Sequence, residues 1–311
     1  MAPMTADSAA HPSAPAPSAP ALGLAESSDG TSIAYRVLGD PAARPLVLVH
    51  GWAQSSACWG PEVLAALARR FRVVAPDLRG HGYSDVAEAG YDAPEQWADD
   101  LEAVLDAAGV APAAADPSAA GAGRPAAATD PSAGAILLGW SYGGIVVSDY
   151  LASRGQDRVA GIVLCGAVTS ISRSAGGAVG PAMMQVADGG FDEDPATAIA
   201  ALQRFGSAMM RSGDGISRQR TFGLSMSTPP AVRQKLLNRR VDNDETLRAL
   251  RLPALVIHGE HDGVVPPSTG RANAELIPGA TYVGFADSAH APFLEEPSRF
   301  VEELEAFATR V

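Results

Sequence analysis

The sequence predicts an α/β protein in which helices cover a mostly parallel sheet. Short runs rich in Leu and β-branched residues recur along the chain, and each is bounded by Gly, Pro or Asp. Segments with a helical spacing of apolar residues lie between these runs. Such an alternation is typical of parallel sheets whose strands are joined by helices. The runs are apolar almost throughout, which suits strands that are buried on both faces.

Strands are expected at the six clearest apolar runs. These are residues 46–50, 72–75, 135–138, 159–165, 254–258 and 281–285, and residues 32–37 are expected to add an edge strand. Helices are expected at residues 61–70, 94–108, 143–153 and 297–308. Three of these helical segments begin with Pro, which fits a first turn because its missing N–H would have no partner there.

Length and composition predict one large folded unit with an insertion. A chain of 311 residues with 47% apolar residues can bury a sizeable core. This core is assigned to residues 25–169 and 251–311. Residues 170–250 contain amphipathic windows at 195–205 and 230–240, between two expected strands. They predict a helical cap over one end of the sheet.

Two segments are too poor in large apolar residues to pack against a core. Residues 1–24 are rich in Ala, Pro and Ser, and they lack the basic start and the apolar run of a signal peptide. They are interpreted as a disordered tail. Residues 111–134 are interpreted as a mobile low-complexity loop, because Ala, Pro, Gly and Asp dominate them.

Charge and cysteine content narrow the choice of partners. Lys and Arg number 23 and Asp and Glu number 35, so the formal net charge is −12, which disfavours nucleic acid and anionic membrane surfaces. No apolar run approaches the ~20 residues of a membrane span, and a cytoplasmic location is expected. Cys58 and Cys165 suggest neither a disulfide framework nor a cysteine-based metal site. A small-molecule substrate is the expected partner, and the oligomeric state stays open.

The most specific motif is Gly139-Trp140-Ser141-Tyr142-Gly143, a G-x-S-x-G sequence between an expected strand and an expected helix. On a sharp strand-to-helix turn the serine hydroxyl stands exposed above the sheet, and the glycines let neighbouring backbone pass closely. The N-terminus of the following helix favours negative charge that develops there. A Gly-rich turn without chemistry is the alternative. A nucleotide site is disfavoured because G-x-G-x-x-G and a phosphate-binding Lys are missing.

A serine nucleophile needs a base, and His290 is the candidate. Where the nucleophile sits on such a turn, the triad follows the chain order Ser, acid, His. The other histidines lie in the tail or precede the acid, and they are His11, His50, His81, His258 and His261. His290 stands in a loop after the last expected strand, from which its ring can reach Ser141. A structural or solvated loop histidine is the alternative.

Asp262 is the expected acid that orients His290, because it lies in the turn after the penultimate strand. Glu260 is the local competitor, and a solvated turn carboxylate is the alternative for either residue. The same turn contains potential metal ligands, namely His258, Glu260, His261 and Asp262. Successive residues on a strand alternate between faces, so these side chains are not expected to converge on an ion. Neither a metal nor a cofactor is predicted.

The motifs and their order resemble the α/β-hydrolase fold family over nearly the whole chain from about residue 25. His50-Gly51-Trp52 looks like the family's H-G-x turn, and residues 77–85 are similar to its D-x-R-G-x-G-x-S segment. The resemblance implies a mostly parallel eight-stranded sheet flanked by helices, with a helical cap insertion. It also implies an oxyanion hole formed by the backbone N–H groups of Trp52 and Tyr142.

The resemblance also narrows the reaction. Ser141 excludes relatives that open epoxides or displace halide with an aspartate nucleophile. The remaining relatives include esterases, lactonases, C–C bond hydrolases and cofactor-free perhydrolases of the haloperoxidase type. The expected function is a serine hydrolase that cleaves a small neutral ester, lactone or related acyl substrate through an acyl-enzyme on Ser141. A ligand sensor that keeps the fold without turnover is a second hypothesis.

Overall fold

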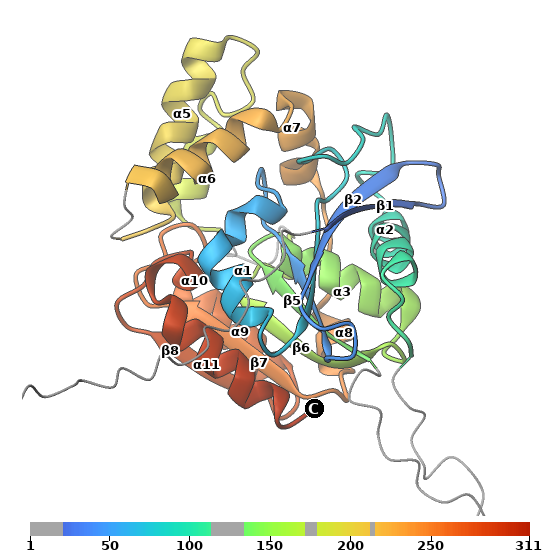
Figure 1. Ribbon diagram of the computed structural model, residues 1–311. Helices are drawn as coiled ribbons and strands as arrows, with labels where there is room; N and C mark the ends of the chain where they lie inside the picture. The colour runs from blue at the N-terminus through green and yellow to red at the C-terminus, as the bar shows by residue number, and fades with distance from the viewer. Residues whose placement is uncertain (1–20, 113–133, 172–178, 212–214) are drawn as a thin grey trace, which may run out of the picture.

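An eight-stranded sheet forms the centre of the structure (Figure 1). The computed structural model describes residues 21–112, 134–171, 179–211 and 215–311. The strand order is β1-β2-β4-β3-β5-β6-β7-β8; β2 pairs antiparallel with β1 and β4, and all other neighbours pair parallel. The strands are β1 (Ala21–Glu26), β2 (Ser32–Leu38), β3 (Pro45–Val49), β4 (Arg72–Pro76), β5 (Ala135–Trp140), β6 (Val159–Cys165), β7 (Ala254–Gly259) and β8 (Thr281–Phe285).

The middle of the sheet is buried on both faces, which explains its continuous apolar sequences. Every residue of β3, β5 and β7 is buried, whereas most of β8 at the sheet edge is half-buried. Strands β3 to β8 all run parallel to one another. Their carboxyl ends therefore lie at one edge of the sheet. In open α/β sheets this edge is where ligands bind.

Helices flank the sheet in two packed groups. α1 (Pro61–Leu67) packs against α11 (Pro297–Ala308), and α2 (Pro94–Ala107) packs against α3 (Gly143–Arg154). α9 (Pro267–Leu276) lies on β7. Proline begins α1, α2, α9 and α11, where its fixed φ suits the first turn. The short elements η1 (Ser56–Trp59) and α10 (Pro292–Glu295) follow β3 and β8.

A helical insertion separates β6 from β7. Its helices are α4 (Pro181–Val186), α5 (Pro195–Ala208), α6 (Gly215–Ser227), α7 (Pro230–Asn238) and α8 (Asp244–Arg248). Figure 1 shows α5, α6 and α7 gathered at one end of the molecule, away from the C-terminus. α6 packs against η1, and the Trp52 indole N–H donates to the Arg233 carbonyl of α7 at 2.9 Å. The insertion is thus joined to the loop that follows β3.

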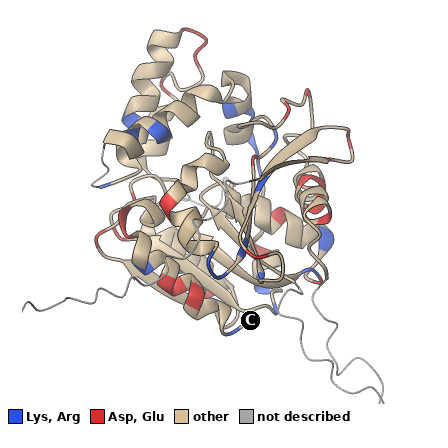
Figure 2. Ribbon diagram, viewed as in Figure 1, with Lys and Arg blue, Asp and Glu red and all other residues tan. Residues whose placement is uncertain are grey.

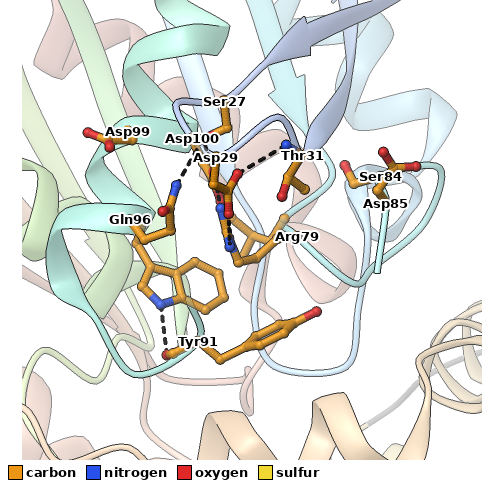
Figure 3. A network of polar contacts seen from close by, with 12 residues as sticks. Ser27, Asp29, Thr31, Arg79, Ser84, Asp85, Tyr91, Gln96, Asp99 and Asp100 are labelled. Carbon is orange, nitrogen blue, oxygen red and sulfur yellow. Dashed lines mark hydrogen bonds and ion pairs between the residues drawn. The ribbon is translucent and has the colours of Figure 1, made fainter. Parts of the chain in front are cut away.

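A buried ion pair fastens the β1–β2 hairpin to α2 (Figure 3). The Arg79 guanidinium donates to both oxygens of Asp100 at 2.6 Å, and Asp100 also accepts from the Ser27 hydroxyl at 2.6 Å. Arg79 reaches Asp29 in the hairpin turn at 3.1 Å. Arg79, the arginine of the D-x-R-G-x-G-x-S segment, therefore has a structural role: it links α2 to the β1–β2 hairpin.

The fold class predicted from the sequence is confirmed, and the six principal strands and four helices appear with ends shifted by a few residues. Two details are wrong. Residues 21–24 belong to β1 instead of the tail, because they pair with β2 in register from Ala21 opposite Val37. Consequently β2 is the second strand instead of the edge strand. Residues 1–20 and 113–133 lie outside the described part of the chain.

Across the described ranges, none of the helices combines the length and apolarity that crossing a membrane requires.

Candidate active site

Ser141 lies on a strained turn between β5 and α3. Its φ is 55°, a left-handed conformation that residues other than glycine rarely adopt. The Ser141 N–H donates to the Cys165 carbonyl at 3.0 Å, and the Ser141 carbonyl accepts from the Val168 N–H at 3.1 Å. A Cβ at Gly143 would lie 2.2 Å from the Val49 carbonyl oxygen, so this position of the motif requires glycine. The motif therefore has the strand-turn-helix setting that exposes a serine hydroxyl.

His290 and Asp262 meet beyond the carboxyl ends of two neighbouring strands. Asp262 follows β7 and His290 follows β8. His290 Nδ1 lies 2.7 Å from Asp262 Oδ2, and both side chains are buried. Since an ionised carboxylate only accepts hydrogen bonds, we assign the proton of the neutral ring to Nδ1. Nε2 is then left with a lone pair that can take a proton from a hydroxyl.

Four donors surround the Asp262 carboxylate. Oδ1 accepts from the backbone N–H groups of Val264 at 2.8 Å and Val265 at 2.9 Å. Oδ2 faces His290 Nδ1 and also His258 Nε2, the latter at 3.2 Å. Burial alone would raise the pKa of Asp262, but the two histidines outweigh burial and hold this pKa below its usual value. Asp262 is therefore an ionised acceptor at neutral pH.

The competing carboxylate, Glu260, takes part in a different interaction. Its two oxygens accept from the Arg271 guanidinium at 2.9 and 2.8 Å, and the Tyr282 hydroxyl donates to it at 3.3 Å. The hydrogen bond from Arg271 lowers the pKa of Glu260. Glu260 is thus an outward-facing partner of α9 and β8.

The turn after β7 brings together two residues that the sequence analysis did not pair. His258 Nε2 lies 3.2 Å from Asp262 Oδ2. The reason is that the chain turns back after the strand, with the Asp262 N–H donating to the Gly259 carbonyl at 3.2 Å. Nowhere in the described residues do three His, Cys, Asp or Glu side chains form a group that could hold a metal ion. The only sequence signal for the contact between His258 and Asp262 is their spacing of four residues across the end of β7.

The His–Asp pair and the Ser141 turn both lie against Cys165 and Gly166, at the end of β6. A Cβ at Gly166, one residue after Cys165, would lie 3.3 Å from both Asp262 Oδ2 and His290 Nδ1. The Trp140 indole N–H donates to the His290 carbonyl at 2.8 Å, and the two rings lie 5.4 Å apart. Among the hydrogen bonds of the described residues, none joins the Ser141 hydroxyl to the His290 ring. The three residues are therefore neighbours, and only the His–Asp contact is formed.

Trp52 lies in the loop after β3, whereas Tyr142 directly follows Ser141 at the start of α3. Within the described chain, neither backbone N–H donates to a protein acceptor. Trp52 follows the Gly51 turn, in which a Cβ on Gly51 would lie 2.9 Å from the Ser141 Cβ. Ala53 has φ 51°, so this loop carries the second left-handed residue besides Ser141 in the described non-glycine backbone.

His50 holds the Gly51 turn from inside. Its Nδ1 lies 2.8 Å from the Gly51 carbonyl oxygen, and its Nε2 accepts from the Leu78 N–H at 2.9 Å. Burial lowers the pKa of His50 to about 4, so the ring is neutral at physiological pH. A neutral ring with one donor and one acceptor fits both contacts.

An apolar pocket opens beside Ser141. The space between its lining residues is about 320 Å³ with the open solvent at its mouth, but only about 20 Å³ of it can hold water-sized molecules. The core and the insertion both supply its walls, and none of the described lining residues carries a charge. Besides Ser141 they are Trp52, Tyr142, Ile145, Val168, Ile171, Val179, Met183, Leu237, Val264 and Val265.

A buried polar network lies behind one pocket wall. The Arg239 guanidinium, at the end of α7, donates to the Tyr142 hydroxyl at 3.2 Å and to Asp149 Oδ2 of α3 at 2.8 Å. Asn243 donates to the other Asp149 oxygen at 3.1 Å. Both members of the ion pair are fully buried. This network ties the helical insertion to the residue that follows Ser141.

The fold and this arrangement define a class of protein, and comparison with known sequences agrees. The profile of the Alpha/beta hydrolase family matches residues 46–303. The chain belongs to this family.

Relatives with related activities are similar along most of the chain. The crystal structure of the esterase RhEst1 from Rhodococcus sp. ECU1013 is 49% identical and superposes with a TM-score of 0.83, over 93% of this chain and 98% of the esterase. A bifunctional esterase/perhydrolase from Acinetobacter calcoaceticus is 28% identical over 92% of this chain and 99% of its own. A pimeloyl-[acyl-carrier protein] methyl ester esterase from Vibrio cholerae is 28% identical over 85% and 94%. The protein is an esterase-like enzyme of the carboxylic ester hydrolase type.

Proposed function

We propose that the protein is a serine hydrolase that cleaves small neutral esters, lactones or related acyl substrates through an acyl-enzyme on Ser141. One observation carries the proposal. Ser141, in a left-handed conformation, lies near the buried pair of His290 and Asp262 and lines an uncharged pocket. Nucleophile, base and orienting acid are the groups that acyl transfer requires. The relatives named as esterases support the reaction class.

In the proposed reaction Ser141 Oγ attacks the substrate carbonyl carbon while His290 Nε2 takes the hydroxyl proton. The backbone N–H groups of Trp52 and Tyr142, which lack protein acceptors in the described chain, would bind the oxygen that becomes negative. His290 then returns the proton to the departing alkoxide, and the alcohol leaves. Water repeats the sequence on the acyl-enzyme and releases the carboxylic acid. Catalytic hydrogen bonds often close only around a bound substrate, which fits an open Ser141 to His290 contact.

The pocket supports the choice of substrate. Its uncharged walls give an anionic acyl group no counter-ion, and the net charge of −12 repels anions at long range. Apolar groups gain about 25 cal/mol per Å² when they are buried there. The small free space of about 20 Å³ in this pocket favours a short acyl group over a lipid chain.

Active-site labelling with a fluorophosphonate tests the nucleophile. Peptide mass mapping should place the adduct on Ser141, and Ser141→Ala should remove both the label and the turnover of p-nitrophenyl esters. Turnover should fall on the order of 10³-fold or more, leaving only what binding and the oxyanion donors provide. An adduct on another residue, or a Ser141→Ala variant with near-normal turnover, would contradict the proposal.

Perhydrolase activity is a second candidate, supported by the relative named a bifunctional esterase/perhydrolase. The same acyl-enzyme would be attacked by hydrogen peroxide in place of water, releasing a peracid. A peroxide-dependent halogenation assay with acetate distinguishes a perhydrolase from a hydrolase, because a hydrolase gives no signal in it.

A ligand sensor is the alternative outside enzymes. It would bind substrate stoichiometrically without repeated turnover.

A further inference from the structure

His258 places a second imidazole on the carboxylate that pairs with His290. It lies near the end of β7 and is wholly buried. Its Nε2 lies 3.2 Å from Asp262 Oδ2 and 3.0 Å from the Val265 carbonyl oxygen. Both of these atoms accept hydrogen bonds, so the proton of His258 resides on Nε2. One donor therefore holds the Asp262 carboxylate and the backbone of the turn that contains it.

The packing around the other nitrogen of His258 restricts the ring. Nδ1 has no hydrogen-bond partner within the described residues, and a Cβ at Gly270 of α9 would lie only 2.3 Å from it. α9 therefore packs its backbone directly against the ring and leaves no room for rotation. A second proton on Nδ1 would bury a donor without an acceptor, which costs about 1–3 kcal/mol. The surroundings thus favour the tautomer of His258 that donates through Nε2.

We propose that His258 is a positioning residue for the His290–Asp262 pair. Its bond to Oδ2 keeps the Asp262 carboxylate turned so that the same oxygen faces His290 Nδ1. It also draws charge from Oδ2, which weakens the attraction of Asp262 for protonated His290. The inference rests on the proposed function, in which His290 is the base.

Few other ionisable groups lie near the pair. Cys165 lies beside Asp262, and burial raises the pKa of its thiol, so it is uncharged. Glu295 accepts from the backbone N–H of Ala289, beside His290, at 2.7 Å. Glu260 is occupied by Arg271. His258 is thus the group whose loss changes the hydrogen bonding of Oδ2.

The test compares three variants by the pH dependence of kcat and KM for a p-nitrophenyl ester. His258→Leu removes the donor, and kcat should fall about tenfold with little change in KM, because a hydrogen bond to a charged group is lost. The midpoint of the pH–activity curve should move up by about half a pH unit, because Asp262 then holds a protonated His290 more strongly. His258→Gln can donate from the same position and should restore both values. His261→Leu, on the exposed side of the same turn, is the matched control and should change neither.

A second measurement does not depend on activity or on the folding of a His258 variant. In Ser141→Ala, nitrogen-15 NMR should show His258 as the Nε2–H tautomer and His290 as the Nδ1–H tautomer. The opposite tautomer of His258 would overturn the inference. So would equal losses in His258→Leu and His258→Gln without a shift of the midpoint, since that pattern reports damage to packing alone. If labelling shows that Ser141 is not the nucleophile while the two tautomers are as stated, the proposed function fails and the arrangement around Asp262 stands.

Discussion

Two carboxylates stand two positions apart on the turn after β7, and only Asp262 faces a buried histidine. We expect Asp262→Asn to lower kcat on the order of 10³- to 10⁴-fold, because an amide favours the wrong tautomer of His290. Glu260→Gln should change kcat less than about threefold, since it removes only a surface ion pair with Arg271. Steady-state kinetics of the two variants with one ester measure the difference. The reverse ranking would assign the acid to Glu260.

Single buried histidines also set the acid stability. Burial lowers the pKa of His50 to about 4 and that of His81 to about 3, and the two rings lie 5.2 Å apart. In the unfolded chain both have a pKa near 6.5, so the unfolded state binds more protons below that pH. Their contribution to stability is complete above pH 6.5 and is lost as the pH falls toward 4 and then 3. Between pH 7 and pH 5 the loss should be about 2 kcal/mol for each histidine.

Urea unfolding at a series of pH values measures this loss. His81→Asn keeps a donor that can reach the Arg79 carbonyl and removes the titrating group, so the free energy of unfolding should depend less steeply on pH. His261→Asn changes an exposed residue and should leave the slope as it is. An unchanged slope in His81→Asn would show that other groups account for the acid sensitivity.

At the scale of elements, two buried ion pairs join helices to their neighbours in nearly the same way. Asp149 of α3 pairs with Arg239 and accepts from Asn243, whereas Asp100 of α2 pairs with Arg79 and accepts from a serine. Asp149→Leu removes the carboxylate partner of the buried Arg239 and should lower the free energy of unfolding by about 3–5 kcal/mol. Asp100→Leu leaves Arg79 its ion pair with Asp29 and should lower the free energy of unfolding by less.

Their effects on catalysis should differ. Arg239 also donates to the Tyr142 hydroxyl, so Asp149→Leu should disturb the pocket wall and lower kcat/KM about ten- to a hundredfold. Asp100→Leu acts on the β1–β2 hairpin and should leave kcat/KM within about twofold. Both are measured at a temperature where urea titration shows each variant folded. Equal losses of kcat/KM would mean that the Arg239 network acts only through stability.

The elements that could be predicted from the sequence are those whose pattern is local. The G-x-S-x-G turn and the helices that begin with Pro carry their signal within a few residues, and they were found where expected. β1 was missed because its Ala- and Gly-containing sequence becomes a strand only through pairing with β2. The contact between His258 and Asp262 was missed for a similar reason, since it depends on how the turn after β7 folds back.

At the scale of the whole molecule, the acidic charge and the uncharged pocket should together select the substrate. Figure 2 shows acidic residues along α2 and α11, on the outside of the molecule. Among p-nitrophenyl esters, short neutral acyl groups should have the highest kcat/KM, and a carboxylated acyl chain of equal length should react at least tenfold more slowly. A preference for long chains or for the carboxylated ester would contradict this expectation.

The insertion should set the size limit. Met183 is buried in the pocket wall, whereas the adjacent Met184 is 67% exposed. Met183→Ala should lengthen the preferred acyl chain by about two carbons, because it opens space at the wall. Met184→Ala serves as the control and should leave the preference unchanged. Kinetics over a series of ester lengths measure both, and identical profiles in the two variants would place the size limit elsewhere.

The left-handed backbone at Ser141 has a consequence for how this protein evolves. Holding a serine in that conformation costs on the order of 1–3 kcal/mol, whereas glycine adopts it without penalty. Selection for stability alone would therefore replace Ser141 with glycine. A serine at this strained position is what the proposed role of its hydroxyl as nucleophile predicts. The free energies of unfolding of Ser141→Gly and Ser141→Ala measure this cost. Both variants should be inactive, and the glycine variant should be the more stable one.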